Sequence, residues 1–359
     1  MWLWRRLGIE VSDSMSLFRY TNPVITDPTL SLRDPCIVKD GGRWWLTGTS
    51  QPVWGGQNPG VRLLVSDDLL KWEHHSWIVD AEKLPADCFF NGRFWAPEIH
   101  PAHGKFWLTV ASGHEGPEHG ERRMDGHHIV LFRADRIDGP YELVTREGPL
   151  GQGFKNDASL FTDGDGCSYL YCSGGGLWQA RIDLKQGRLI GEMEKILGPR
   201  DEGNPEWMIG GIEGPFVIRR HGFYWMFFTA WTRGYETGLL RAEHPLGPWT
   251  LARAEPLFGT RKRHYREAQM IEGGYAHLEF EDTPDPFVEV GHGCVFEGPD
   301  GNDWFCAHYF AEGREPVAGS PVPEWHDSVP QLGIEPILAK ESGFEIAGPT
   351  WTERLVEIS

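Results

Sequence analysis

Apolar and polar residues follow the same pattern five times along this chain. In each copy, a short polar start with Pro or Gly leads into an apolar strand, a tight turn and an aromatic-rich strand. The copies cover residues 33–50, 94–112, 156–174, 212–230 and 291–309. Their turns, such as Asp40-Gly41-Gly42 and His221-Gly222, contain the residues that tight β-hairpins favour. The pattern therefore predicts five β-hairpins.

A second strand-forming stretch follows each of the first four hairpins. These stretches are residues 63–73, 130–143, 177–190 and 239–251. Together they give four antiparallel strands per repeat, which is the blade of a β-propeller. The repeat of about 60 residues is longer than the roughly 40–45 residues of WD40 blades, and a β-sandwich has no such period. We therefore predict an all-β fold: a five-bladed β-propeller with four antiparallel strands per blade.

The domain boundaries follow from where the pattern starts and stops. We expect residues 20–359 to form the single propeller domain and residues 1–19 to be an N-terminal extension, in which Met15 is an alternative start to Met1. The stretch after about residue 330 is expected to help close the ring. Two long polar departures, 113–128 and 259–290, are predicted to be loops on the faces of the disc.

Composition restricts the classes of partner. The chain is 40% hydrophobic and 24% charged, as in globular proteins, and its formal net charge is −18. Such a charge argues against nucleic acid and anionic membrane surfaces as partners, and it is compatible with a neutral ligand such as a sugar. The 17 Trp residues suit both a β-rich core and stacking on sugar rings. The sequence gives no basis for an oligomeric state.

Cysteine usage and the N-terminal residues bear on the compartment. The six cysteines show no zinc-type CxxC spacing, and most lie in strand-like apolar runs, so we expect buried, reduced thiols. Neither a secretory apolar run nor a membrane-spanning stretch stands out. These observations predict a cytoplasmic protein. The cysteines are Cys36, Cys88, Cys167, Cys172, Cys294 and Cys306.

Aligning the five hairpins puts several ionisable side chains in one position. This slot contains Asp34, Ala96, Asp157, Glu213 and His292. The first strand of every propeller blade lines the central axis, so these residues are predicted to meet there. Three carboxylates around one axis resist joint ionisation, which is a cost that indicates an active site. Glycoside hydrolysis needs a carboxylic acid and a carboxylate, and a third acidic group can keep the acid protonated.

The starts of the blades resemble, in order, the signatures of glycoside hydrolase family 43. The resemblance runs from about residue 20 to 310, and it includes Asn22-Pro23 and residues 66–72. The matching motifs are Arg33-Asp34-Pro35, Trp95-Ala96-Pro97-Glu98, Asn156-Asp157-Ala158-Ser159-Leu160-Phe161, Glu213-Gly214-Pro215 and Gly291-His292-Gly293.

The resemblance implies a catalytic propeller that hydrolyses xylose- or arabinose-containing saccharides with inversion, as a β-xylosidase or α-L-arabinofuranosidase. Asp34 matches the general base, Asp157 the carboxylate that tunes and orients the acid, and Glu213 the general acid. His292 matches an axial histidine that in some members lies near a structural ion. No cofactor is required, and a structural calcium or sodium ion near the axis is compatible with the resemblance.

Further residues are candidates for binding the sugar. Trp95 matches an aromatic wall of the sugar pocket, with core packing as the alternative, and Trp54 is a stacking candidate in the first long loop. His292 is a candidate for contact with the substrate, and the alternatives are a buried, hydrogen-bonded axial side chain and an ion-linked role. Arg314 is a loosely aligned candidate for an arginine that holds sugar hydroxyls. We predict no catalytic metal, because the spacing of the histidines at 114, 119, 127 and 128 fits no standard site.

Two alternatives stay open from the sequence. A retaining fructosidase can use the same propeller, but its first-blade nucleophile motif is absent, and Arg33-Asp34-Pro35 stands there instead. A carbohydrate-binding propeller without activity predicts that at least one acid is missing, whereas all three are present. Because a cytoplasmic enzyme meets short imported oligosaccharides, we expect exo-action that releases single terminal sugars.

Overall fold

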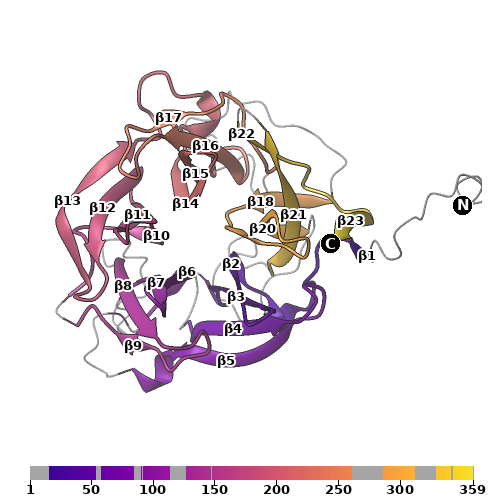
Figure 1. Ribbon diagram of the computed structural model, residues 1–359, viewed down its shortest axis with the longest axis horizontal. Coiled ribbons are helices and arrows are strands. Elements are labelled where there is room, and N and C mark those ends of the chain that lie inside the picture. The colour runs from indigo at the N-terminus through magenta and orange to yellow at the C-terminus, as the bar shows by residue number, and fades with distance from the viewer. Residues whose placement is uncertain are drawn as a thin grey trace, which may run out of the picture.

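Each predicted hairpin forms the inner part of a β-sheet, and five such sheets stand around a central axis in a computed structural model (Figure 1). The prediction of a five-bladed β-propeller is confirmed. The residues that the structure describes are 16–53, 58–84, 90, 92–113, 127–146, 148–260, 286–311, 329–340 and 343–358.

The first four blades are antiparallel four-stranded sheets whose strands follow one another in sequence. Blade 1 contains β2 (Arg33–Asp40), β3 (Arg43–Thr49), β4 (Gly60–Ser66) and β5 (Glu73–Asp80). Blade 2 contains β6 (Phe94–Ala102), β7 (Lys105–Ser112), β8 (His128–Ala134) and β9 (Glu142–Leu143). Blade 3 contains β10 (Asn156–Thr162), β11 (Ser168–Ser173), β12 (Leu177–Asp183) and β13 (Arg188–Leu197). Blade 4 contains β14 (Ile212–Arg220), β15 (Phe223–Ala230), β16 (Glu236–Ala242) and β17 (Thr250–Leu251).

Blade 5 has a divided inner strand. Both β18 (Phe287–Gly291) and β19 (Val295–Glu297) pair with β20 (Asp303–Ala311), which continues to β21 (Gln331–Lys340) and β22 (Gly343–Ile346). Three short 3-10 helices complete the described elements: η2 (Pro28–Leu30), η3 (Ala81–Lys83) and η5 (Glu206–Met208).

The chain ends close the ring, as expected for the stretch after residue 330. Strand β1 (Ser16–Tyr20) pairs antiparallel with β23 (Arg354–Ile358) beside blade 5 (Figure 1). Residues 16–19, which the sequence placed in an extension, are therefore part of a strand, whereas residues 1–15 and the choice between Met1 and Met15 lie outside the described residues.

One buried carboxylate ties the closing segments together. Glu335 accepts hydrogen bonds from the hydroxyls of Tyr20 (3.2 Å) and Tyr309 (3.1 Å) and from the side-chain amide of Asn22 (3.0 Å). It also accepts from the backbone N–H and hydroxyl of Thr350, at 2.6 and 2.7 Å. The N-terminal segment, blade 5 and the C-terminal tail thus share one polar centre.

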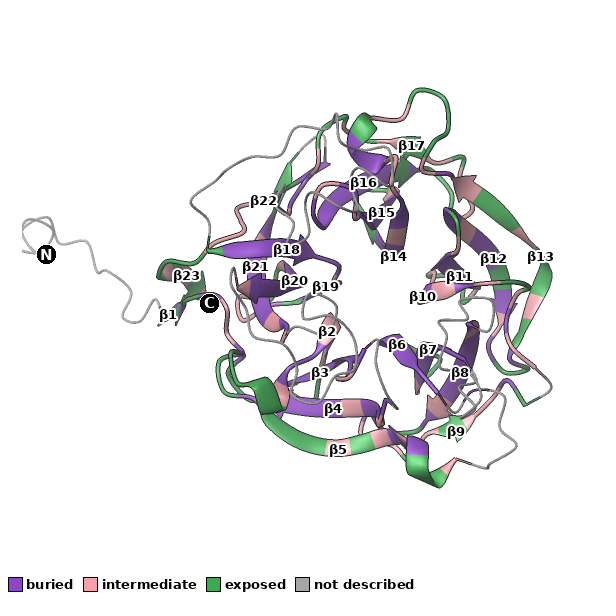
Figure 2. Cartoon of the chain, turned by 180° about the vertical axis from the view of Figure 1, so that it is seen from behind, coloured by how far each residue is buried: buried purple, intermediate pink, exposed green. Residues whose placement is uncertain are grey.

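The core is divided among the contacts between neighbouring blades. Blades 1 and 2, 2 and 3, 3 and 4, 4 and 5, and 5 and 1 each enclose a cluster of buried apolar side chains. Inner strands are largely buried, whereas almost all residues of the outer strands β5 and β13 are exposed or half-buried (Figure 2). This distribution explains the aromatic-rich second strands, which fill the space between sheets. Among the described residues, no helix has the length and apolar character to cross a membrane.

Candidate active site

The inner strands of blades 1 to 4 begin with the same irregularity. In blade 1, Arg33 pairs with Thr49, and the next paired residue, Cys36, pairs with Thr47. The two residues between them on β2 therefore lie opposite a single residue of β3. Such a bulge re-aims side chains at the start of a strand. The first bulged residue of blades 1, 2 and 3 has a positive φ: 53° at Asp34, 40° at Ala96 and 49° at Asp157. His292, which directly follows β18 in blade 5, also has a positive φ of 42°. Left-handed backbone at non-glycine residues is costly and clusters at functional sites.

The alignment of the five hairpins, which placed Glu213 at the same position as Asp34 and Asp157, is wrong by one residue in blade 4. In blade 4 the positive φ belongs to Gly214 (57°), not to Glu213. Glu213 pairs with Thr229 as Arg33 pairs with Thr49 and Asn156 with Ser173. Its counterparts in blades 1 and 3 are therefore Arg33 and Asn156. Glycine adopts this backbone conformation without strain, so blade 4 presents its acidic side chain one position earlier.

Despite this shift, the axis brings the three predicted acids and His292 together. The Nδ1 atom of His292 lies 3.4 Å from Oδ1 of Asp34 and 3.4 Å from Oε1 of Glu213. Asp157, Glu213 and His292 each present one oxygen or nitrogen within 4.8 Å of the other two. Residues from blades 1, 3, 4 and 5 thus form one cluster.

Asp34 is held as a carboxylate. The hydroxyl of Thr49 donates to its Oδ2 (2.8 Å), and Nε of Arg33 lies 3.5 Å from its Oδ1. Burial by itself would raise the pKa of Asp34, but the positive charge of His292 and the neighbouring His308 and Arg33 bring the pKa far below its usual value. Asp34 is therefore suited to accept a proton from water.

Asp157 has the opposite electrostatic character. It is buried, and it accepts hydrogen bonds from the Ser173 hydroxyl (2.9 Å) and from the backbone N–H of Gly214 (3.3 Å). Burial and the nearby Glu213 carboxylate raise the pKa of Asp157 to about 7. Because the Glu213 carboxylate opposes its ionisation, Asp157 retains its proton up to near-neutral pH.

His292 supplies positive charge among these acids. Burial would lower its pKa, but Asp34, Glu213 and Asp157 raise the pKa of His292 to about 10. The neighbouring His308 is fully buried, and burial lowers its pKa to about 4, so it is neutral. A charged imidazole from blade 5 explains how three carboxylates can share the axis.

Exposure separates the two members of the acid pair. The Glu213 side chain is 21% exposed, whereas Asp157 is only 2% exposed. A group that delivers a proton to a substrate must reach it, while a group that orients the donor need not. The geometry fits Glu213 as the donor and Asp157 as its buried partner.

The other predicted binding residues differ in what the structure says of them. Trp95 is buried, its indole N–H donates to the carbonyl of Val53 (3.1 Å), and its ring lies 4.2 Å from that of His127. Trp54 and Arg314 lie outside the described residues, as do most of the predicted loops 113–128 and 259–290. His127, which was expected in a solvated loop, is instead buried against Trp95, and burial lowers its pKa to about 3.

Sequence reasoning missed the second layer around the acids. Thr49 and Ser173 end the second strand of their blades, and His308 occupies the equivalent ladder position opposite Gly291. A polar residue at the end of an aromatic strand was a readable signal. Arg33 was visible only as part of a motif, and its contact with Tyr235 depends on how the blades meet.

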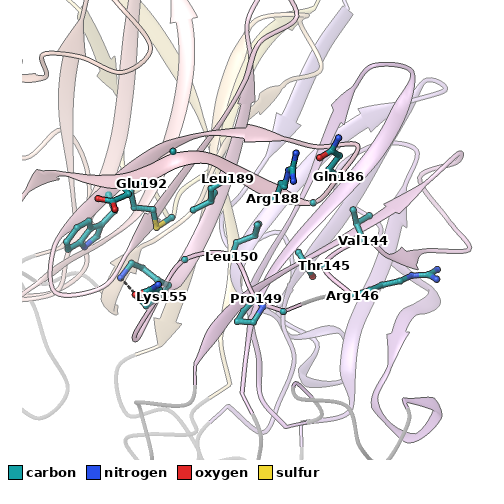
Figure 3. A pocket seen from close by; sticks show the side chains of 17 residues that line it. Val144, Thr145, Arg146, Pro149, Leu150, Lys155, Gln186, Arg188, Leu189 and Glu192 are labelled. Atoms are coloured by element: carbon teal, nitrogen blue, oxygen red, sulfur yellow. Dashed lines mark hydrogen bonds between the residues drawn. The ribbon is translucent and has the colours of Figure 1, made fainter.

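A separate cavity between blades 2 and 3 has a different character. It has a volume of about 640 Å³, and its lining includes Leu150, Lys155, Trp178 and Arg188 (Figure 3). The amine of Lys155 bonds the carbonyls of Gln152 and Phe154 at 3.0 and 3.3 Å. This cavity has no pair of facing carboxylates among its lining residues, so it does not match the chemistry of the axial cluster.

Comparisons with known proteins agree with the geometry. The family model of the glycosyl hydrolases family 43 matches residues 20–343. A xylan 1,3-beta-xylosidase of a Vibrio species is 24% identical over 88% of this chain and 52% of its own length. A beta-D-galactofuranosidase of Aspergillus niger is 26% identical over 68% of this chain and 64% of its own. The family 43 protein BlXynB of Bacillus licheniformis has a TM-score of 0.69 at 21% identity, over 95% of this chain and 59% of its own.

Carboxyl groups gathered at one site are the groups that glycoside hydrolysis uses. The chain belongs to glycoside hydrolase family 43, in agreement with the resemblance of its blade signatures. It spans about half the length of the xylosidase that it matches. The family match favours this reading over the fructosidase alternative.

Proposed function

We propose that this protein is an inverting, exo-acting glycosidase that releases single xylose or arabinose residues from short oligosaccharides. The observation that carries the proposal is the placement of His292 Nδ1 at 3.4 Å from both Asp34 and Glu213. The proposed base and acid thus face one charged imidazole at the axis.

In the proposed reaction, Glu213 donates its proton to the glycosidic oxygen as the bond from that oxygen to the anomeric carbon breaks. Asp34 removes a proton from a water molecule whose oxygen forms the new bond to the anomeric carbon. Asp157 keeps Glu213 protonated before the reaction and orients it. The products are a free sugar with inverted configuration at its anomeric carbon and the rest of the oligosaccharide, which leaves as an alcohol.

The spacing of the acids is compatible with inversion. The oxygens of Asp34 and Glu213 that face His292 are no more than about 7 Å apart, since each lies 3.4 Å from one nitrogen. Inverting pairs span about 6.5–9.5 Å and retaining pairs about 5–5.5 Å, so this upper limit allows either outcome and the product configuration decides between them. The strongly lowered pKa of Asp34 also suits a base that is ionised before water binds.

Exo-action and a cytoplasmic location are part of the proposal. The Vibrio relative is named a xylosidase, which supports release of terminal sugars. The five described cysteines are free, and the sulfurs of Cys294 and Cys306 lie 3.5 Å apart without a disulfide, which suits a reducing compartment. Activity that appears only after cell lysis would support this location, and activity in the medium of intact cells would contradict it.

The proposed reaction needs no cofactor. Asp157, Glu213 and His292 have the atom types and spacing to bind a cation, so the calcium or sodium ion suggested by the resemblance stays a prediction. The positive charge of His292 already offsets the carboxylates, so we expect dialysis against EDTA to leave kcat/KM unchanged. A loss of activity that Ca²⁺ restores would instead make an axial ion part of the site.

A panel of 4-nitrophenyl glycosides tests the substrate class. It contains the β-D-xyloside, α-L-arabinofuranoside, β-D-galactofuranoside and β-D-fructofuranoside. We expect one of the two pentosides to have the highest kcat/KM, and proton NMR of the first product formed to show inversion at the anomeric carbon. Retention of configuration, or mixed oligomers as the first products from xylan or arabinan, would contradict the proposal. Binding of sugars without turnover would identify an inactive propeller.

A further inference from the structure

Arg33 occupies in blade 1 the position that Glu213 occupies in blade 4. Each is the last paired residue before the bulge, opposite Thr49 and Thr229 respectively. In blade 4 this position presents the acid to the axis. The equivalent position of blade 1 presents a guanidinium group directly beside the base, and neither the sequence motif nor the family match assigns it a role.

The guanidinium group is fixed from several sides. Nη2 of Arg33 donates a short hydrogen bond to the hydroxyl of Tyr235, and Nε lies 3.5 Å from Oδ1 of Asp34. The guanidinium carbon lies 5.2 Å from the centre of the Tyr235 ring and 5.6 Å from that of Phe310. Aromatic faces and a hydroxyl hold such a group in one orientation, which lowers the entropy that a ligand must overcome.

One edge of Arg33 stays available. An arginine has five N–H donors, and within the described part of the chain Nη1 donates to no acceptor. The side chain is nevertheless 13% exposed, so part of it remains in contact with solvent. A rigid donor with an accessible edge is suited to bind a ligand.

Charge indicates which kind of ligand this is. Asp34, Glu289 and Glu213 all act on Arg33 and, with Tyr235, raise its pKa even though burial opposes the charge. The positive charge is therefore already balanced by carboxylates. An anionic ligand would meet their repulsion, whereas a neutral hydroxyl can accept an N–H at no such cost.

We propose that Arg33 binds the substrate through Nη1, at the hydroxyl next to the anomeric carbon of the sugar that is cleaved. This inference rests on the proposed glycosidase function. Asp34 must hold water against the anomeric carbon, and Nε of Arg33 is 3.5 Å from that carboxylate. The hydroxyl nearest to this point is the one on the adjacent carbon, and hydrogen bonds to it strengthen in the transition state of glycoside hydrolysis.

The test compares a substrate that has this hydroxyl with one that lacks it. The probes are the 4-nitrophenyl pentoside with the higher kcat/KM, either β-D-xylopyranoside or α-L-arabinofuranoside, and its 2-deoxy analogue. For the wild type and for Arg33→Met, the ratio of kcat/KM between the two probes is measured. We expect Arg33→Met to reduce this ratio roughly 10- to 100-fold, the worth of one hydrogen bond from a charged donor.

Further variants guard against a purely structural effect. Arg33→Lys keeps the positive charge but lacks the guanidinium group that can bind Tyr235 and the sugar at the same time. Tyr235→Phe removes only the hydroxyl that accepts a hydrogen bond from Arg33. We expect both variants to reduce the ratio less than Arg33→Met does. Arg241→Met is the matched control, because Arg241 also lies over two rings, 4.6 Å from Phe223 and 6.0 Å from Trp225, but on β16 away from the axis. We expect it to leave the ratio unchanged.

The outcomes separate this inference from the proposed function. If the wild type cleaves neither pentoside, the proposed function fails. If the wild type cleaves one and the Arg33 variants lose activity equally on both probes, Arg33 has only a structural role and the inference is overturned. Should Arg33→Met not fold, Arg33→Lys decides: a ratio equal to that of the wild type overturns the inference.

Discussion

Thr49 and Ser173 occupy equivalent ladder positions in blades 1 and 3, and each donates its hydroxyl to the acidic residue at the start of its own blade. The Thr49 hydroxyl bonds Asp34 at 2.8 Å, and the Ser173 hydroxyl bonds Asp157 at 2.9 Å. Thr49 also accepts the backbone N–H of Ala96 (2.7 Å), which links blade 1 to blade 2. The propeller repeat thus supplies the same support to two acids with opposite protonation.

Ser173→Ala should move the alkaline limb of the pH profile upward. The Ser173 hydrogen bond favours the charged form of Asp157, whose pKa is about 7, so its loss raises that pKa further and the acid pair keeps its proton to higher pH. We expect a shift of roughly 0.5–1 pH unit in kcat/KM, the equivalent of one hydrogen bond. Ser168→Ala, at the far end of β11, should cause no shift.

Asp157→Asn should move the same limb downward. Asp157 is the group whose pKa is raised to about 7, and an amide in its place cannot hold a proton, so the site should lose activity at lower pH than the wild type does. The pH profile of kcat/KM on an aryl pentoside measures this shift. An upward shift in Asp157→Asn would show that Asp157 does not help to retain the proton.

Glu213→Ala and Asp34→Ala should differ in their dependence on the leaving group. A general acid matters most when the departing alcohol is poor, so Glu213→Ala should lower kcat/KM on xylobiose or arabinobiose by roughly 10²–10⁴-fold. On a dinitrophenyl glycoside, whose phenolate leaves unaided, the loss should be far smaller. Asp34→Ala should damage both reactions, because water must be activated in either case.

Kinetics on one disaccharide and one activated glycoside distinguish these roles. Glu206→Gln is a control from blade 4, since Glu206 is exposed on η5 and should affect neither substrate. If Asp34→Ala were the variant sensitive to the leaving group and Glu213→Ala were not, the assignments of acid and base would be reversed.

His292→Gln should destabilise the protein in a pH-dependent way. The folded-state pKa of about 10 exceeds the unfolded value of 6.5, so the stabilisation is complete below pH 6.5 and is lost as the pH rises toward 10. Removing one member of a buried ionic cluster costs about 3–5 kcal/mol. Urea unfolding should show that the variant has a much lower free energy of unfolding than the wild type at pH 6 and a smaller difference at pH 10. An equal difference at both pH values would contradict the charge assigned to His292.

Glu335→Ala should weaken ring closure without changing the chemistry at the axis. The substitution leaves the donors of Tyr20, Asn22, Tyr309 and Thr350 without their common acceptor, at a cost of about 3–5 kcal/mol. Thermal unfolding should show a clearly lower Tm, while kcat/KM at low temperature is retained. Glu345→Ala, exposed on β22, should change stability by less than about 0.5 kcal/mol.

The periodic part of the fold could be predicted from the sequence, because every blade repeats one local pattern. The turn at Gly41 and Gly42, with φ of 58° and 79°, has the positive values that its residues indicated. The predicted acids meet because the first strand of each blade lines the axis. An alignment anchored on Pro35, Pro97 and Pro215 would also have placed Gly214, rather than Glu213, in the slot.

Contacts between blades could not be predicted in this way. The sequence does not say that His308 flanks Asp34, that Tyr235 fixes Arg33, or that Trp95 is covered by His127. Each of these contacts joins residues from different strands or blades, so it depends on the angle between sheets rather than on a local period. The same reason hides the raised pKa of Asp157, because the neighbouring Glu213 lies in a separate blade.

The polar centre at Glu335 has a consequence for how the chain acquires its shape. Blades 1 to 4 pair strands that are neighbours in sequence, whereas the bonds from Tyr20 and Asn22 to Glu335 span 315 and 313 residues. Contacts of such separation form late and slow the folding of a domain. During synthesis, the face of blade 1 that packs against blade 5 therefore stays uncovered until blade 5 has been made. Apolar surface exposed in this way favours aggregation.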